Sequence, residues 1–297
     1  MLLSAVWGAS FLFIKVAVGT VPPLTVVAAR LVIAAVLLAV FVHARGVRLP
    51  ASFRAWRPFL LVGITGNVLP FALINWGETR IDSGLAATLI GTMPFFTVLF
   101  AHRFTGDERL TRKKLAGIAI GFAGIAVLVG PEALAGFGAD IAAELAVCGA
   151  AVSYAATAVY CRKLARISPE VTAAASIIAG AAIAVPLSLI FERPWSIAPS
   201  GPALAAIGAL AVLSTALGAL LFFRLLASAG ATFAALSNYL IPLSGVLWGV
   251  LLLGERPGVN ALVTLAMILA SIALVRRGTP KSSRREGGGG GTAKTGR

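Results

Sequence analysis

The sequence predicts an all-α membrane protein that crosses the bilayer many times. Of its 297 residues, 59% are hydrophobic and only 12% are charged, which is too apolar for a soluble protein. The apolar residues are grouped into runs of about 20, the length of a helix that spans the hydrocarbon core. Membrane strands would be about ten residues long with alternating polarity, so a β-barrel is excluded.

Ten apolar runs can be placed along the chain. They cover residues 2–18, 24–43, 58–77, 83–103, 113–130, 139–160, 170–191, 202–223, 231–253 and 259–275. The first run has no basic segment before it, so we interpret it as a retained span and not as a cleaved signal peptide. The basic, Gly-rich end of the chain, residues 277–297, is expected to be disordered.

The net charge of +14 does not indicate a nucleic-acid partner, because the basic residues are sorted by loop. If ten spans are threaded from one side of the bilayer, most of the 25 lysines and arginines return to that side. Basic loops stay on the cytoplasmic side of a membrane. The sequence therefore predicts a multi-pass protein of the cell (inner) membrane with both termini in the cytoplasm.

One part of the chain occurs twice. Residues 86–128, and again the residues from 234 onward, contain an apolar helix with a central proline, a Gly-acid-Arg turn and a second apolar helix. At a shift of 148 residues, Pro94 aligns with Pro242. Because five spans is an odd number, the second half must be inverted, and inverted repeats with a site at mid-membrane are typical of secondary transporters. We expect two inverted five-helix repeats, 1–130 and 139–276, around a central cavity.

Aromatic and hydroxyl side chains at matching places in the first and sixth helices are candidates for lining this cavity. Trp7 and Ser10 share a face of the first helix, and Tyr154 and Thr157 occupy the equivalent positions in the sixth, at a shift of 147 residues. Serine and threonine also bond back to their own helix, and tryptophan packs well in cores. Simple packing is therefore the alternative interpretation.

The third helix carries the most polar stripe of the chain, which contains Asn67, Asn75 and Glu78. Polar residues inside a span face protein or water and not lipid. Asn75 and its neighbour Trp76 are the first choice for contact with a solute. The alternative is that these residues form interhelical hydrogen bonds that only hold the bundle together.

Three charged residues are expected at the outer end of the bundle, namely Lys15, Arg30 and Glu78. An arginine in lipid is unfavourable unless it reaches the interface or pairs with another group. One interpretation is a structural ion pair near the interface. The other is a charged outer mouth that meets a zwitterionic solute.

The two repeated prolines predict helix kinks at mid-membrane. Pro94 and Pro242 leave unpaired the carbonyl groups four residues earlier, those of Ile90 and Asn238. Such groups are tolerated where protein or a wet cavity satisfies them. Asn238 and Tyr239 are therefore predicted to contact solute, and the prolines are predicted to act as hinges. A purely architectural kink is the alternative.

Small residues recur in the second helix of each copy and permit close helix packing. They are Gly117, Gly121 and Gly124 in the first copy, and Ala266, Ala270 and Ala273 in the second. We interpret the two stripes as scaffold faces or as the contact face of a homodimer.

Several of these motifs together resemble the EamA domain of the drug/metabolite transporter superfamily. They are WGASF at 7–11, Arg30, Pro94 followed by GDERLTRKKLAGIAIGFAGI, and Pro242 followed by GER at 254–256. The resemblance covers nearly the whole chain as two tandem domains. It implies a ten-helix basket whose cavity is lined mainly by helices 1, 3, 4, 6, 8 and 9. It also implies export of amino acids, metabolites or toxic cations, with the aromatic-amino-acid exporters as the first branch for comparison.

The remaining sequence features bear on energetics and on other classes of function. No GxxxxGK[ST] phosphate loop is present, and all acidic residues fall in loops, tails or helix ends, so we predict uncoupled, gradient-driven transport or exchange. No nucleophile–base set or cluster of metal ligands is visible, so no enzyme activity, cofactor or metal is predicted.

The predicted function is thus alternating-access export, or facilitated passage, of amino acids and related small amphipathic metabolites or drugs, including aromatic and cationic compounds. Lipid-linked or nucleotide-sugar metabolites are the alternative substrates. A passive solute channel is the alternative class of protein.

Overall fold

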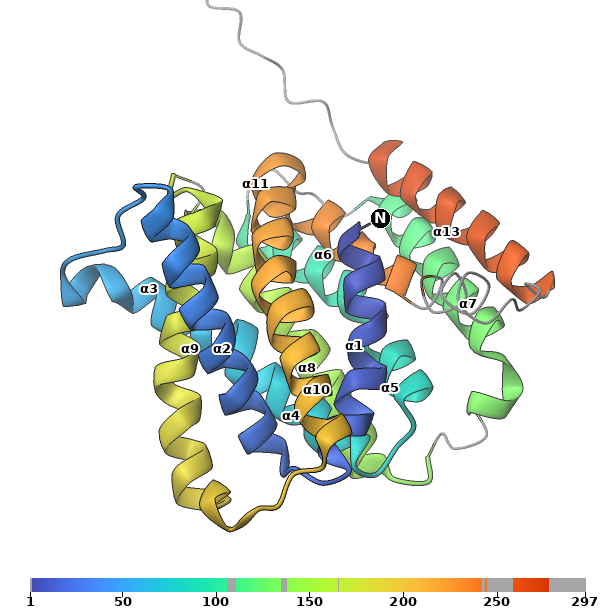
Figure 1. The fold of residues 1–297 in the computed structure, drawn as a ribbon. Coiled ribbons are helices and arrows are strands. Elements are labelled where there is room, and N and C mark those ends of the chain that lie inside the picture. The colour runs from blue at the N-terminus through green and yellow to red at the C-terminus, as the bar shows by residue number, and fades with distance from the viewer. Residues whose placement is uncertain are drawn as a thin grey trace, which may run out of the picture.

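The computed structural model describes residues 2–105, 111–134, 138–164, 166–241, 244 and 259–277, and every regular element in these ranges is helical. In Figure 1 the start of α1 and the end of α13 both lie at the upper side of the bundle. The elements are α1 Leu2–Val18, α2 Pro23–Ala44, α3 Phe53–Gly63, η1 Ile64–Val68, α4 Leu69–Glu78, α5 Ser83–Ile90, α6 Met93–Phe104, α7 Arg112–Leu134, α8 Ile141–Tyr160, η2 Cys161–Leu164, α9 Pro169–Phe191, η3 Pro194–Ser196, α10 Gly201–Ala209, η4 Leu210–Leu217, α11 Gly218–Leu236, η5 Ser237–Tyr239 and α13 Val259–Arg277.

Six helical stretches in the described ranges are long and apolar enough to cross a membrane. They are Pro23–Ala44, Phe53–Glu78, Ser83–Phe104, Ile141–Leu164, Pro169–Phe191 and Gly201–Tyr239, and two shorter apolar helices are Leu2–Val18 and Leu262–Val275. The last of the six joins the predicted run 202–223 to the start of the run 231–253. Gly230 separates the two parts, because its φ of 83° breaks the helix inside α11. These features are those of a multi-pass membrane protein.

Two of the long helices contain a π-helical turn, in which the backbone is wider than in an α-helix. The first, η1, joins α3 to α4 just before Pro70, which has no N–H to donate. Here Ser153 of α8 donates a hydrogen bond to the Thr65 carbonyl at 2.6 Å. The second turn, η4, joins α10 to α11, and the Thr215 hydroxyl donates to the Leu210 carbonyl at 2.9 Å.

At the kink predicted at Pro94, the α-helix is interrupted by a tight turn at Gly91 and Thr92, whose backbone angles stay in the right-handed helical region. The helix α5 ends at Ile90 and α6 begins at Met93, so Pro94 occupies the first turn of a new helix, where its missing N–H is not needed. Pro242, its counterpart, lies outside the described residues. The segment just before it is again irregular, because α11 gives way to the short 3-10 turn η5.

The helices pair over long sequence distances. The helix α2 packs along α9, α4 and α6 pack along α8, and α7 lies beside α13 (Figure 1). The small-residue stripe of α7 faces α13. A Cβ atom on Gly117 would come within 2.8 Å of Val275 and 2.9 Å of the Ser271 carbonyl. The stripe is therefore a packing face within the chain, which supports the scaffold interpretation.

Candidate functional site

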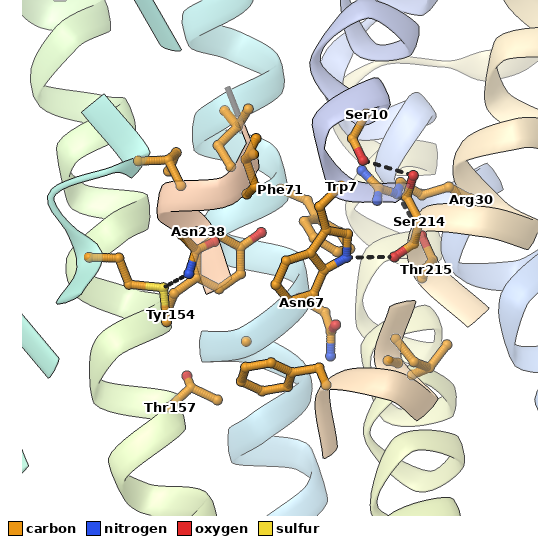
Figure 2. Close-up of a pocket in the computed structure, with 18 of the residues that line it drawn as sticks. Trp7, Ser10, Arg30, Asn67, Phe71, Tyr154, Thr157, Ser214, Thr215 and Asn238 are labelled. Carbon is orange, nitrogen blue, oxygen red and sulfur yellow. Dashed lines mark hydrogen bonds between the residues drawn. The ribbon is translucent and has the colours of Figure 1, made fainter. Parts of the chain in front are cut away.

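A cavity of about 110 Å³ lies in the centre of the bundle, and Figure 2 shows its wall. This volume has room for several water molecules or a small solute. Helices from both halves of the chain form the wall. The residues that line it are Trp7, Ser10, Phe11, Ile14, Arg30, Val62, Gly66, Asn67, Phe71, Ile74, Ile90, Met93, Tyr154, Thr157, Ile177, Ser214, Thr215, Ala219, Phe222, Phe223, Asn238 and Ile241.

The Trp7 indole is fixed on one side of the cavity. Its Nε1 donates a hydrogen bond to the Ser214 carbonyl at 3.1 Å, and its ring lies 5.6 Å from that of Phe222. Gly218 lies directly beside the indole, since a Cβ atom there would come within 2.6 Å of Nε1. The absence of a side chain at Gly218 therefore allows the indole to approach this helix.

Hydroxyl groups on the cavity wall join helices to one another. Ser10 donates to the Ser214 hydroxyl at 2.7 Å, and Ser214 is within 3.4 Å of the Val6 carbonyl. Thr157 donates to the Thr65 hydroxyl at 2.7 Å. Because these hydroxyl protons already have acceptors, they are less available to a solute.

Two polar groups of the wall have no such partner. Asn67 lies in the π-helical turn η1, and its amide makes no hydrogen bond within the described ranges. The Tyr154 hydroxyl also has none there, while its ring meets Phe71 edge-on at 6.4 Å. By contrast, Asn238 donates to the Ala235 carbonyl at 2.9 Å and contacts Met93 Sδ at 3.1 Å. Asn67 and Tyr154 are thus the uncharged groups best placed to bind a solute.

Arg30 also belongs to the cavity wall. It is only 3% exposed, and its Nε donates to the Thr215 hydroxyl at 3.0 Å. The guanidinium carbon lies 3.9 Å from the centre of the Phe71 ring. This distance is that of a cation–π contact, so Arg30 is held by one hydrogen bond and by one aromatic face.

Among the charges of the expected outer mouth, Arg30 and Glu78 form no direct ion pair in the described residues, although they are near enough for their charges to interact through space. Lys15 donates to the backbone carbonyls of Glu78 and Ile81, both at 2.9 Å, and so caps the end of α4. Glu78 is fully buried, and neither carboxylate oxygen has a hydrogen-bond partner in the part of the chain that the structure describes. The reason is helical spacing, because Glu78 lies about 10 Å further along α4 than Phe71, against which Arg30 packs.

Asn75 and Trp76, the first choice from the sequence, do not line the cavity. Asn75 is fully buried, and its Nδ2 donates to the Pro23 carbonyl at 3.1 Å, which ties α4 to the start of α2. This geometry supports the interhelical alternative. The physical reason is that eight residues turn a helix by about 80° beyond two full turns, so a face that contains Asn67 does not contain Asn75.

Tyr239 is also turned away from the cavity. It is fully buried, and its hydroxyl donates to the Ile118 carbonyl of α7 at 3.0 Å. The neighbouring Asn238 does line the cavity. The two side chains differ because consecutive residues of a helical turn point in directions about 100° apart.

The sequence repeat is visible in the wall itself. Trp7 and Tyr154 both line the cavity, as do the equivalent pairs Ser10 with Thr157 and Asn67 with Ser214. Each pair is separated by the same shift of 147 residues. Applying this shift to Asn67 would have identified Ser214 as a wall residue, whereas Thr215 and Phe222 had no comparable signal in the sequence.

The family model of EamA-like transporters matches residues 1–130 and again residues 141–277. The chain belongs to the EamA-like transporter family. Helices α1 to α6 and most of α7 fall in the first matched range, and α8 to α13 fall in the second. The resemblance noted from the motifs is thus confirmed.

Sequence relatives of this EamA-like chain carry transporter names. A probable terminal-alkyne amino-acid exporter of Streptantibioticus cattleyicolor is 31% identical over 275 residues, which cover 92% of this chain and 90% of that protein. An S-adenosylmethionine/S-adenosylhomocysteine transporter of Chlamydia trachomatis is 33% identical, over 84% of this chain and 79% of that protein. The uncharacterized inner membrane transporter YedA of Escherichia coli is 27% identical, over 92% of this chain and 88% of that protein.

The fold is also found in a solved structure. A crystal structure of another protein is similar with a TM-score of 0.74, covering 94% of this chain and 96% of that chain at 23% sequence identity. In the described ranges, no group of three or more histidines, cysteines, aspartates and glutamates could hold a metal ion. The family and the names of the relatives indicate a transporter.

Proposed function

We propose that this chain exports, or facilitates the passage of, amino acids and related small amphipathic metabolites across the inner membrane by alternating access. The observation that carries the proposal is the central cavity, whose wall combines aromatic faces with unpartnered polar groups from both halves of the chain. Aromatic rings bind apolar side chains by stacking and burial, and a few fixed polar groups orient the solute.

We further propose the topology of ten helices in two inverted five-helix repeats, 1–130 and 139–276, with a tail at 277–297 and both termini in the cytoplasm. Three observations support it. Equivalent residues of the two halves line one cavity, each half contains a π-helical turn beside it, and the start of α1 and the end of α13 lie at the same side of the bundle. The family model also matches twice.

The turn before Pro94 supports a hinge in this proposal. Between Ile90 and Met93 the α-helix gives way to a tight turn of two residues, and Ile90 and Met93 both line the cavity. A change in backbone angles there would move the cavity wall directly. We assign the same role to Pro242 from the repeat.

Amino acids are the favoured substrates for two reasons. Two relatives have names that denote amino acids or amino-acid derivatives as their substrates. The cavity is also small, and its faces are mainly aromatic and aliphatic. A nucleotide sugar or a lipid-linked sugar is much larger and carries phosphate groups, for which several cations would be expected, whereas Arg30 is the one cation among the wall residues that line the cavity.

Counterflow in proteoliposomes tests this function. Liposomes that contain the purified full-length protein are loaded with unlabelled phenylalanine, and the uptake of labelled phenylalanine is followed against protein-free liposomes. A carrier gives saturable uptake that rises with the internal load, whereas a passive channel gives uptake that does not saturate. Accumulation that follows an imposed pH gradient would contradict the uncoupled mechanism, and nucleotide-sugar uptake without amino-acid uptake would contradict the substrate class.

A further inference from the structure

The guanidinium of Arg30 is held on one side only. Its Nε donates to the Thr215 hydroxyl at 3.0 Å, and that hydroxyl donates onward to the Leu210 carbonyl at 2.9 Å. Phe71 covers one face of the guanidinium at 3.9 Å. The hydrogen bond to Leu210 sets the orientation of the Thr215 hydroxyl. The contacts of Arg30 with Thr215 and Phe71 therefore fix the direction of its terminal nitrogens.

Within the described ranges, the other side of the guanidinium has no hydrogen-bond acceptor, and the buried Glu78 carboxylate acts on it only through space. An arginine has five N–H donors, and the bond from Nε uses one of them. The terminal nitrogens of Arg30 have no hydrogen-bond or ion-pair partner in the described ranges, although the residue lines the cavity (Figure 2). Arginine keeps its charge, and an unpaired charge away from bulk water is unfavourable. A solute that brings an anionic group would remove this deficit.

The equivalent position in the second half of the chain carries no matching charge. At the shift of 147 residues that relates the two halves, the position equivalent to Arg30 is Ile177, which also lines the cavity. Met93 and Ile241 add further apolar surface. The cavity thus has one cationic position and a mostly apolar remainder, which matches a molecule with one anionic end.

We propose that the terminal nitrogens of Arg30 bind the carboxylate of the transported solute. The proposal deepens the function given above and rests on it: the substrates are small carboxylates, amino acids included, and the corresponding amines and amides are rejected. The planar fork of a guanidinium matches a carboxylate with two parallel hydrogen bonds. The solute side chain then lies against Trp7 and Phe222.

Equilibrium binding to the purified full-length protein in detergent tests the subsite without requiring transport. Labelled phenylalanine is displaced with N-acetylphenylalanine, which keeps the carboxylate, and with phenylalaninamide and phenethylamine, which lack it. We expect displacement by the first compound only. Inorganic phosphate is included because arginine also binds phosphate, and displacement by phosphate at lower concentrations than by N-acetylphenylalanine would overturn the assignment to a carboxylate.

Variants at Arg30 complete the test. We expect Arg30→Met to weaken phenylalanine binding by about tenfold or more, because a charge-assisted pair of hydrogen bonds is lost. Arg30→Lys should lie between Arg30→Met and the parent protein, since lysine keeps the charge without the fork. Arg80→Met is the matched control, because Arg80 pairs with Asp140 at 3.2 Å away from the cavity. Its phenylalanine affinity should be unchanged.

The possible results separate the subsite from the transport function. Unchanged phenylalanine affinity in Arg30→Met, equal binding of amide and acid by the parent protein, or no binding of any carboxylate would overturn the subsite. If Arg30→Met does not give a monodisperse protein, the Arg30→Lys affinity decides the question. Arg30-dependent carboxylate binding without any counterflow would refute transport and leave the subsite standing. Equal counterflow of the amide and the acid would support transport and overturn the subsite.

Discussion

The indole of Trp7 in α1 donates its hydrogen bond to the carbonyl of Ser214, a residue of the π-helical turn η4 that lies 207 positions later in the chain. In a π-helical turn a carbonyl pairs with the N–H five residues on. A carbonyl oxygen has two lone pairs, so it can also accept a hydrogen bond from a side chain. The bond therefore joins the two halves of the protein at the wall of the cavity.

Gly218→Ala is expected to move this indole. A Cβ atom there would come within 2.6 Å of Nε1 of Trp7, which is too close for the two atoms to remain in place. The indole would have to shift into the cavity, and overpacking of this kind costs about 1–3 kcal/mol. We expect phenylalanine affinity to fall about tenfold, measured by equilibrium binding.

Gly208→Ala is the matched control for this prediction. In the described residues, no atom lies within 4 Å of a Cβ placed at Gly208, which belongs to the same helical stretch, Gly201–Tyr239. Alanine favours a helix over glycine by about 0.5–1 kcal/mol, so the control should bind normally and unfold at the same or a higher temperature. Equal binding by the two variants would show that the position of Trp7 does not matter for the solute.

Asn67 and Asn75 should respond in opposite ways to alanine. The Asn67 amide faces the cavity and makes no hydrogen bond within the described ranges, so Asn67→Ala should lower solute affinity and change stability by less than about 0.5 kcal/mol. Asn75 is fully buried and donates to Pro23. Asn75→Ala should destabilise the protein by about 1–3 kcal/mol and leave affinity intact.

Thermal unfolding and phenylalanine binding, measured on both asparagine variants, check this contrast. The reverse pattern, with Asn75→Ala folded normally but unable to bind, would restore the interpretation drawn from the sequence alone. Loss of both properties in Asn67→Ala would show that its amide supports the helix and not the solute.

The cavity was predictable from the sequence wherever the repeat and the helical period were sufficient. Trp7 and Tyr154 were chosen as equivalent residues on one helix face, and both line the cavity. The stripe drawn from Asn67 to Asn75 assumed that residues eight apart share a face, but eight residues turn a helix by about 80° beyond two full turns. Ile74, seven residues after Asn67, does line the cavity.

Arg30 shows a second limit of sequence-based prediction. Its position in α2 is close to the outer level of Lys15 by residue count, but the long side chain ends between Thr215 and Phe71. These partners come from other helices, and their approach depends on tertiary packing. The sequence predicted Arg30 at the outer end of the bundle, in an ion pair or a charged mouth, and only the structure placed the side chain in the cavity wall.

Glu192→Ala should loosen the start of α2. The Glu192 carboxylate, at the end of α9, accepts hydrogen bonds from the backbone N–H groups of Leu24 and Thr25 at 2.9 and 2.6 Å and from the Thr25 hydroxyl at 2.8 Å. The first N–H groups of a helix have no partner within the helix. Hydrogen bonds to charged groups are worth about 1.5–3 kcal/mol, and we expect a loss of that size in thermal or denaturant unfolding.

Glu170→Ala is the control for this cap. Glu170 pairs with Arg224 at 2.8 Å, but the Arg224 side chain is 51% exposed. Exposed ion pairs contribute about 0–1 kcal/mol, so the control should unfold close to the parent protein. Equal destabilisation by the two variants would indicate a general effect of charge and not a specific cap on α2.

Gly63→Ala should be the most damaging single change in the packing of α3 on α9. A Cβ atom at Gly63 would lie 2.8 Å from the Gly180 nitrogen and 3.0 Å from the Ser176 carbonyl oxygen. Both are backbone atoms, so no side-chain rotation relieves the contact, and the helices must separate. Separation would carry η1 and Asn67 with it. We expect a loss of about 3 kcal/mol in stability together with weaker phenylalanine binding. Gly84→Ala is the control, because no atom in the part of the chain that the structure describes lies within 4 Å of a Cβ there, and it should change neither stability nor binding. A Gly63→Ala protein with the parent's unfolding temperature would contradict the close approach of these two helices.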